Sequence, residues 1–161
     1  MTGVESKMKA EAHLADGEFE KAVKAFRAAI KEDPDDAEAH FGLAEASSAL
    51  ADSSVNEVAS AYRKAIDLDP GNIFYRTSYA DFCMENGVFK AAEEQYLAVA
   101  DLDRDNEHVY LADFAVSYRR WATEFPERTG IDDDEVSRKA LDYCLKALRL
   151  SREDAQRLLR P

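Results

Sequence analysis

One segment of the chain carries carboxylates at the spacing of a cation-binding loop. Asp101, Asp103 and Asp105 alternate as the first ligands of a calcium loop do. Such a loop also needs glycine at its sixth position and glutamate at its twelfth, where this sequence has Asn106 and Ala112. We therefore interpret the segment as a turn whose Asp and Asn side chains cap the following helix, and not as a calcium site.

The histidines and cysteines are too scattered to form a metal or catalytic site. His13, His40 and His108 lack a second histidine or a cysteine at ligand spacing, so we expect packing or surface roles. Cys83 and Cys144 are interpreted as small buried thiols in a reducing compartment, with a disulfide or a metal pair as the alternative. Neither a glycine-rich phosphate loop nor a G-x-S-x-G nucleophile motif occurs. The sequence thus predicts a protein that is not an enzyme, with no catalytic residue, no cofactor and no metal.

Charge and hydropathy narrow the classes of partner. The chain has 33 acidic residues against 21 Lys and Arg, a formal net charge of −12. Such an acidic coat repels nucleic acid and anionic lipid, so neither nucleic acid nor a membrane is expected as a partner. No apolar run reaches the roughly 18–20 residues that span a bilayer. The first residues also do not resemble a signal peptide, and we expect a cytoplasmic protein.

The chain repeats itself with a period of about 35 residues. A glycine followed by Phe and then Ala occurs at Gly17 and again at Gly87, two periods later. Acidic turns that contain Pro34 and Pro70 separate the first copies, whereas the turns at 101–106 and 150–154 lack proline. The second halves of four copies align as Ala22/Phe26/Ala29/Pro34, Val58/Tyr62/Ala65/Pro70, Ala92/Tyr96/Val99/Arg104 and Ala140/Cys144/Ala147/Arg152.

Each period contains two helical stretches. In the first copy, Ala22, Phe26, Ala29 and Ile30 fall at i, i+4, i+7 and i+8, which is an apolar stripe of helical period. A small residue near the middle of each first helix would let the two helices of an antiparallel hairpin approach closely. These small residues are Ala10, Ala44, Ala80 and Ala115.

Four such copies in phase resemble the tetratricopeptide repeat, a helix–turn–helix with an A-F-A-P pattern in its second helix. The W-L-G-Y pattern of its first helix is only partly present here, as Leu43-Ala44, Tyr79-Ala80 and Phe114-Ala115. The resemblance implies an all-α fold, a right-handed α-solenoid of about four repeats with a C-terminal capping helix. It covers 1–161 as one domain, with repeats at about 3–36, 37–72, 73–107 and 108–152, and the cap at 152–160.

Two departures from the period are expected to form connections. The second repeat has two extra residues between its helices, around Asp52–Ser54. The long insert near 126–134 in the fourth repeat should extend the first helix to Phe125 and form a loop at 126–131. Asp132–Asp134 should then cap the next helix. We also expect Trp121 to pack against the fourth hairpin while Arg119 and Arg120 point outward.

The resemblance implies a binding surface on the concave wall of the solenoid, which the first helices line. Large apolar groups should face solvent at its centre, with acidic residues around them and arginines at the far end. We expect a peptide or partner helix with an apolar anchor and flanking Lys or Arg; the alternative is that the phenylalanines pack between repeats. The predicted groove residues are Phe41, Phe74 and Met84 at the centre, Glu45, Asp81 and Glu85 around them, and Lys7, Glu11, Arg119 and Arg120 elsewhere on the wall.

The leading interpretation is an adaptor or scaffold that binds another protein. A clamp for the C-terminal carboxylate of heat-shock chaperones, known in one subfamily, is disfavoured because its five positions are matched only at the first. These positions are Lys7, Glu11, Gly42, Phe74 and Ser78. The runner-up is a regulatory or self-assembling domain of a larger protein, which could be an enzyme, so self-association is the alternative.

Overall fold

The computed structural model describes residues 3–124 and 131–158, and every regular element in those ranges is helical. The predicted all-α fold class is therefore confirmed. The chain divides into two compact units, Met1–Tyr75 and Arg76–Pro161, and the division falls inside helix α5 (Ile73–Glu85). Within the described residues, no helix combines the length and the apolarity that crossing a membrane requires.

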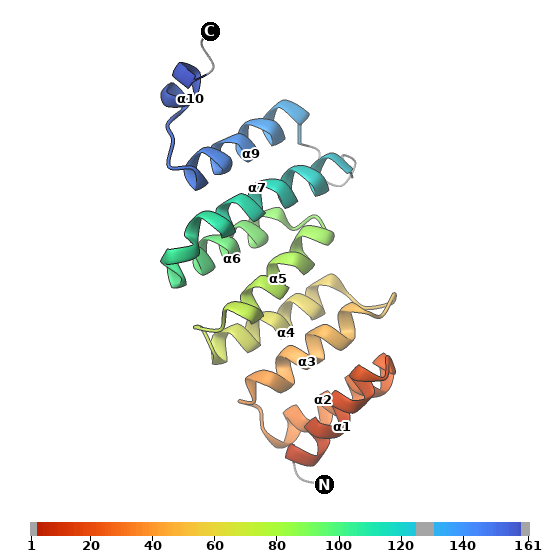
Figure 1. The fold of residues 1–161 in the computed structure, drawn as a ribbon. Coiled ribbons are helices and arrows are strands. Elements are labelled where there is room, and N and C mark those ends of the chain that lie inside the picture. Colours follow the sequence, from red (N-terminus) through yellow and green to blue (C-terminus); the bar gives the residue numbers. More distant parts are fainter. Residues whose placement is uncertain (1–2, 125–130, 159–161) are drawn as a thin grey trace. The chain divides into compact units, whose positions relative to one another are not determined.

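The first unit is a series of helices that pack in chain order. It contains α1 (Gly3–Ala15), α2 (Phe19–Glu32), α3 (Ala37–Ser48), α4 (Val55–Leu68) and the residues of α5 up to Tyr75. Each of the first three helices contacts the next one along the chain, and α1 also contacts α3 (Figure 1). The two first helices, α1 and α3, therefore lie side by side and carry predicted groove residues of this unit.

The second unit also contains helices that pack in chain order, and the first helix of its last hairpin is longer. The rest of α5 is followed by α6 (Phe89–Leu102), a short 3-10 turn η1 (Arg104–Asn106), α7 (Glu107–Glu124), α9 (Asp133–Ala147) and α10 (Arg152–Leu158). Helix α7 packs against α6 and α9, and α10 contacts α9 (Figure 1). At 18 residues, α7 exceeds the 12 residues of α3 and the 13 of α5, as the insert predicts. The predicted loop falls largely on 125–130, outside the described residues.

The core repeats the same residue types at the same helix positions. Phe26, Tyr62 and Tyr96 each lie near the middle of a second helix and are at most 7% exposed. On α3, a Cβ atom added to Gly42 would lie 2.2 Å from Cζ of the Phe26 ring, so only glycine permits this contact between α2 and α3. The small residues predicted to allow close hairpins are all buried: Ala10, Ala44, Ala80 and Ala115.

The turns at Gly17 and Gly87 share one geometry. Both glycines have φ of +73°, a left-handed conformation that glycine adopts without steric cost. Each glycine N–H donates to a carbonyl three residues back, and the next N–H donates to a carbonyl five residues back. This pair of bonds is the Schellman motif that ends helices, so the repeated glycines mark the ends of α1 and α5.

The acidic turns between hairpins also share one geometry, with or without proline. The same backbone hydrogen bond closes each of them, from Asp33 to Ala29, from Asp69 to Ala65 and from Asp103 to Val99. In the third turn, which lacks proline, the Asn106 side chain donates to the Asp103 carboxylate at 2.9 Å. The segment with calcium-loop spacing therefore forms a turn between helices.

Helices α9 and α10 have different capping arrangements at their N-termini. Asp132 is the N-cap residue of α9, but its carboxylate makes no capping hydrogen bond, contrary to the sequence-based expectation. Its backbone carbonyl accepts instead from the N–H groups of Glu135 and Val136, and the acidic first turn favours the helix through its dipole. Helix α10 has a reciprocal cap, because Ser151 and Asp154 each donate a backbone N–H to the other's side chain at 3.1 Å.

Candidate functional site

Phe41 is the centre of an aromatic cluster in the first unit. Its ring stacks on Tyr75 with the centroids 4.6 Å apart, and its centroid lies 5.3 Å from that of Phe74 and 5.9 Å from that of Tyr62. We call these four residues the aromatic cluster. Phe41 is half-buried, whereas Phe74 is 64% exposed. Phe74 thus faces solvent as the groove prediction requires, while Phe41 packs against the next repeat, as the alternative expects.

Negative charge gathers around this cluster. Burial raises the pKa of Tyr75, and the charges of Glu38, Asp69 and Asp36 raise it further, while that of Lys7 lowers it. Three carboxylates therefore act on this ring against one ammonium group. These four groups together carry a net negative charge, which favours cationic groups on a ligand.

Lys7 is already engaged by acidic side chains. Its Nζ donates to Oε2 of Glu38 at 2.7 Å and lies 2.9 Å from Oδ2 of Asp36. The hydrogen bonds to Glu38 and Asp36 hold the pKa of Lys7 well above its usual range, although burial opposes them. Asp36 also accepts the backbone N–H of Ala39 at 3.0 Å and caps α3. Lys7 therefore links α1 to the start of α3 and keeps at most one of its three N–H donors for a ligand.

Two predicted acidic residues of the groove each accept a hydrogen bond from a buried tyrosine. The Tyr62 hydroxyl donates to Glu45 in the first unit, and the Tyr96 hydroxyl donates to Asp81 at 3.2 Å in the second. Burial raises the pKa of Asp81, and the hydrogen bond from Tyr96 offsets part of that rise. Burial and the charge of Asp81 raise the pKa of Tyr96 to about 12. These bonds fix the orientation of two carboxylates that the sequence places on a groove wall.

Met84 is buried, and the prediction that it faces solvent is wrong. Its side chain is 2% exposed, and the preceding Phe82 and Cys83 are buried as well. Three consecutive buried residues mean that the last turn of α5 is enclosed on more than one side, unlike a surface helix with a single apolar stripe. Glu85 and Glu11 are exposed as predicted.

Arg119 and Arg120 point outward on α7, which confirms that prediction. The Arg120 guanidinium lies 5.4 Å from the centroid of the Trp121 ring, and its Nε lies 3.8 Å from a carboxylate oxygen of Glu124. Trp121 is half-buried beneath this cation–π contact. Arg120 therefore has two neighbours on its own helix that hold its side chain along the surface.

The second unit contains an ionic network that sequence reasoning missed. Glu93 on α6 accepts the Tyr143 hydroxyl and pairs with Nζ of Lys139, both from α9. The Lys139 ammonium also lies 5.2 Å from the ring centroid of Tyr118 and 5.9 Å from that of Phe114. Burial and the hydrogen bond to Glu93 raise the pKa of Tyr143. The partners of Glu93 lie 46 and 50 residues away in sequence, so no local spacing could reveal the network.

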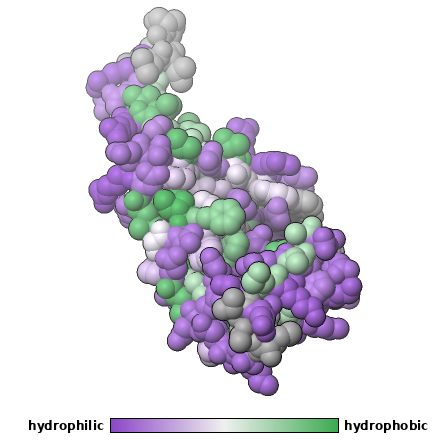
Figure 2. All heavy atoms as spheres, turned by 60° about the horizontal axis from the view of Figure 1, so that its bottom comes forward, coloured by the Kyte–Doolittle hydropathy of each residue, from purple (hydrophilic) through white to green (hydrophobic). Residues whose placement is uncertain are grey.

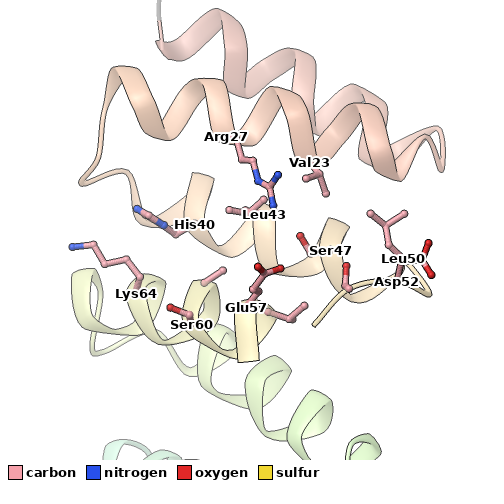
Figure 3. A pocket seen from close by; sticks show the side chains of 13 residues that line it. Val23, Arg27, His40, Leu43, Ser47, Leu50, Asp52, Glu57, Ser60 and Lys64 are labelled. Carbon is pink, nitrogen blue, oxygen red and sulfur yellow. The ribbon is translucent and has the colours of Figure 1, made fainter. Parts of the chain in front are cut away.

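Sequence reasoning also missed a furrow of about 660 Å³ in the first unit, bordered by α2 and α4 with α3 between them (Figure 3). Arg27 from α2 and Glu57 from α4 point into it. His40 and Lys64 lie toward one end of the furrow and Asp52 toward the other. Charges of both signs thus surround apolar side chains, which are Val23, Leu43, Leu50 and Val58.

Polar residues cover most of the face shown in Figure 2, and apolar residues form separate patches between them. The most exposed large apolar side chains of the described residues are Met8, Phe74, Val116 and Leu148, at 64–67%. Phe74 differs from the other three because it extends an aromatic cluster.

Across 3–124 and 131–158, no three His, Cys, Asp or Glu side chains are grouped as metal ligands would be.

Comparison with known proteins identifies the repeat of the first unit. Residues 7–73 match the model of a family described as tetratricopeptide repeat. The matched segment runs from α1 to the start of α5 and so contains the two hairpins α1/α2 and α3/α4. A search of curated proteins finds none that matches the chain.

Proposed function

Because residues 7–73 match the tetratricopeptide-repeat family, we propose that the chain acts as an adaptor or scaffold and binds a peptide or helix of another protein at its aromatic cluster. Repeats of this family generally mediate protein–protein interaction, and their all-helical fold is typically a non-catalytic interaction module. The proposal rests on residues of the first unit alone.

The observation that carries the proposal is the exposed ring of Phe74. It is 64% exposed and its centroid lies 5.3 Å from that of Phe41, whose ring stacks on Tyr75. An exposed aromatic side chain on a rigid aromatic base is the kind of group that anchors a partner's apolar side chain.

The surrounding carboxylates support a partner with cationic flanks. Glu38, Asp69 and Asp36 act on Tyr75 against the single charge of Lys7, and Glu45 lies one helical turn after Phe41 on α3. A Lys or Arg beside the apolar anchor would be attracted by this excess of negative charge, and an Arg guanidinium could also stack on the Phe74 ring. We therefore propose an apolar anchor flanked by Lys or Arg as the recognised pattern.

The experiment selects random 12-residue peptides on the purified wild-type chain and measures their affinities by fluorescence anisotropy. Selected peptides should contain an aromatic or aliphatic residue next to Lys or Arg. The Phe74→Ala variant should bind them at least about fivefold more weakly, because truncating an anchor residue costs over 1 kcal/mol. Leu141→Ala is the matched control, since Leu141 is 51% exposed but lies on a second helix, α9.

Two outcomes would overturn the proposal. One is that Phe74→Ala and Leu141→Ala bind every selected peptide as tightly as the wild-type chain does. The other is a concentration-dependent dimer, detected by light scattering, that Phe74→Ala dissociates. That result would assign the aromatic cluster to self-assembly, the alternative function that the sequence left open.

A further inference from the structure

Positive charge collects on one helix of an otherwise acidic chain. Helix α2 contains four bases and two acids, and it is the only helix among the described residues in which bases outnumber acids. The whole chain has a formal net charge of −12. Lys24 and Lys31 lie within about 60° and 80° of Lys21 around the helix axis, because an α-helix turns by about 100° per residue. The three lysines therefore share one face of α2.

Two of these lysines line a cleft between α1 and α2. Its volume is about 320 Å³, and Lys9 from α1 lines it together with Lys21 and Lys24. Ala25 and Ala28 of α2 also line the cleft and are half-buried. Their short side chains leave room between the longer lysine side chains. We call these five residues the basic cleft.

Two ammonium groups of the basic cleft have no counter-charge. Among the described residues, Lys9 and Lys24 have no carboxylate within 4.0 Å of their Nζ atoms. Lys21 pairs with Glu18 at 2.6 Å, and Glu18 also lies 2.6 Å from Nδ1 of His13. Neighbouring like charges repel each other, and an anionic ligand in the cleft would relieve that repulsion.

We propose that the basic cleft is a second protein-binding site, which takes an acidic peptide segment with Asp or Glu side chains against Lys9 and Lys24. The distance along α2 from Lys21 to Ala28, the last residue of this helix that lines the cleft, is about 10 Å. That length matches about three residues of extended peptide at roughly 3.3 Å each. The ligand is therefore a short acidic segment, whose apolar side chains pack on Ala25 and Ala28.

Charge complementarity favours this occupant over other anionic macromolecules. Nucleic acid and an anionic membrane extend far beyond the cleft, so they would also meet the acidic surface that gives the chain its charge of −12. A short peptide places its few charges within the cleft, and screening within about 10 Å limits repulsion from the rest of the surface. No residue of the basic cleft belongs to the aromatic cluster, so the two sites can be tested separately.

The experiment measures binding of a fluorescein-labelled acidic heptapeptide, with one central Leu between Asp and Glu residues, by anisotropy at about 0.1 M salt. Changing Lys9→Glu together with Lys24→Glu should weaken binding at least tenfold, a loss of about 1.4 kcal/mol or more. The control is Arg63→Glu with Lys90→Glu, which makes the same charge change at two exposed cations on α4 and α6. The control should weaken binding less than about twofold, because its charges lie outside the cleft.

Each remaining outcome would overturn the proposal. Equal losses in the two double variants would mean that only net charge matters. Equal binding of the same peptide with Asn and Gln in place of Asp and Glu would exclude charge recognition. An oligonucleotide of the same charge could bind more tightly than the peptide and depend equally on Lys9 and Lys24, which would assign the cleft to phosphates. If the chain self-associates and Lys9→Glu with Lys24→Glu abolishes that association, the cleft would be assigned to a second copy. If the wild-type chain does not bind the acidic peptide, the basic cleft is not a binding site. Phe74→Ala is expected to bind the acidic peptide as tightly as the wild-type chain does, because Phe74 lies outside the basic cleft.

Discussion

The hydroxyl of Tyr62 donates a hydrogen bond to the carboxylate of Glu45, and this relationship recurs between Tyr96 and Asp81. In both cases a buried tyrosine of a second helix holds an acidic residue of the preceding first helix. A buried hydroxyl needs a partner, and a carboxylate that accepts such a bond loses rotational freedom. The pairing therefore couples core packing to the position of surface carboxylates.

The Tyr62–Glu45 pair should contribute measurably to stability. In urea unfolding, Tyr62→Phe and Glu45→Gln should each lower the free energy of unfolding, with a coupling energy of roughly 1 kcal/mol in a double-mutant cycle. The coupling arises because each substitution removes the same charge-assisted hydrogen bond. Additive effects of the two substitutions would show that the bond contributes nothing.

Gly42 should not tolerate even one additional carbon atom. In Gly42→Ala the new methyl group would meet the ring of Phe26, which is 1% exposed and cannot move aside cheaply. We expect a net loss of about 1–2 kcal/mol, even though alanine favours a helix over glycine by about 1 kcal/mol. Gly71→Ala is the control, because no atom lies within 4 Å of its added Cβ. A rise in the melting temperature of Gly42→Ala would contradict the close contact.

Arg149 should be replaceable by glycine with a gain in stability. Its φ is 54°, which lies in the left-handed region. The backbone N–H of Arg149 donates to the carbonyl of Lys146, and that of Leu150 donates to the carbonyl of Leu145. The turn at Gly17 has the same pair of hydrogen bonds. Relief of the left-handed backbone strain should raise the free energy of unfolding by about 0.5–1 kcal/mol. In contrast, Arg119→Gly inside α7 should lower it by about 1 kcal/mol. Thermal unfolding of both variants checks the opposite signs.

The contact between Lys7 and Asp36 should make the first unit less stable in acid. Burial alone would raise the pKa of Asp36, but the hydrogen bonds from Lys7 and from the Ala39 N–H lower it below its usual value. A carboxyl group with a lowered pKa stabilises the fold above its unfolded pKa of about 3.9, and this stabilisation is lost as the pH falls through the folded-state pKa.

The wild-type chain should therefore exceed Asp36→Asn in unfolding free energy by a constant amount above about pH 5, and this difference should shrink below about pH 4. Urea unfolding at a series of pH values measures it. Asp35→Asn changes an exposed neighbour and should show no such dependence. A difference for Asp36→Asn that does not vary with pH would contradict the assignment.

Glu93 should be the most sensitive carboxylate of the second unit. Glu93→Gln removes the charge that pairs with Lys139 and weakens the acceptor of the Tyr143 hydroxyl, so we expect a loss of roughly 1–3 kcal/mol. The neighbouring Glu94 is exposed, and Glu94→Gln should change stability by less than about 0.5 kcal/mol. Equal effects of the two substitutions in urea unfolding would show that the network does not stabilise α6 against α9.

Features that depend on neighbours in the chain could be predicted from the sequence. The glycines at Gly17 and Gly87 and the aspartates at Asp33, Asp69 and Asp103 close turns through hydrogen bonds that span three to five residues. The buried stripe of each second helix follows from helical periodicity alone. These signals are local, so four imperfect copies were enough to define the repeat.

Positions that depend on how helices meet could not be predicted in the same way. Met84 was assigned to the surface by its register, but the last turn of α5 is enclosed on more than one side. Lys7 was expected to line a groove, yet it pairs with Glu38, 31 residues away. Glu93 on α6 contacts two residues of α9 that lie 46 and 50 positions later in the chain. The basic cleft likewise forms only where α1 lies beside α2.

The sequence by itself determined that this protein is an all-helical repeat protein, where its helices end, and which residues form each apolar stripe. Backbone hydrogen bonds and side-chain periodicity operate over a few residues, and the chain encodes them directly. Only the tertiary structure decided which charges are paired and which aromatic ring stays exposed. Phe74 and Tyr75 are adjacent in the chain, yet the packing of α3 against the start of α5 buries one ring and leaves the other in solvent.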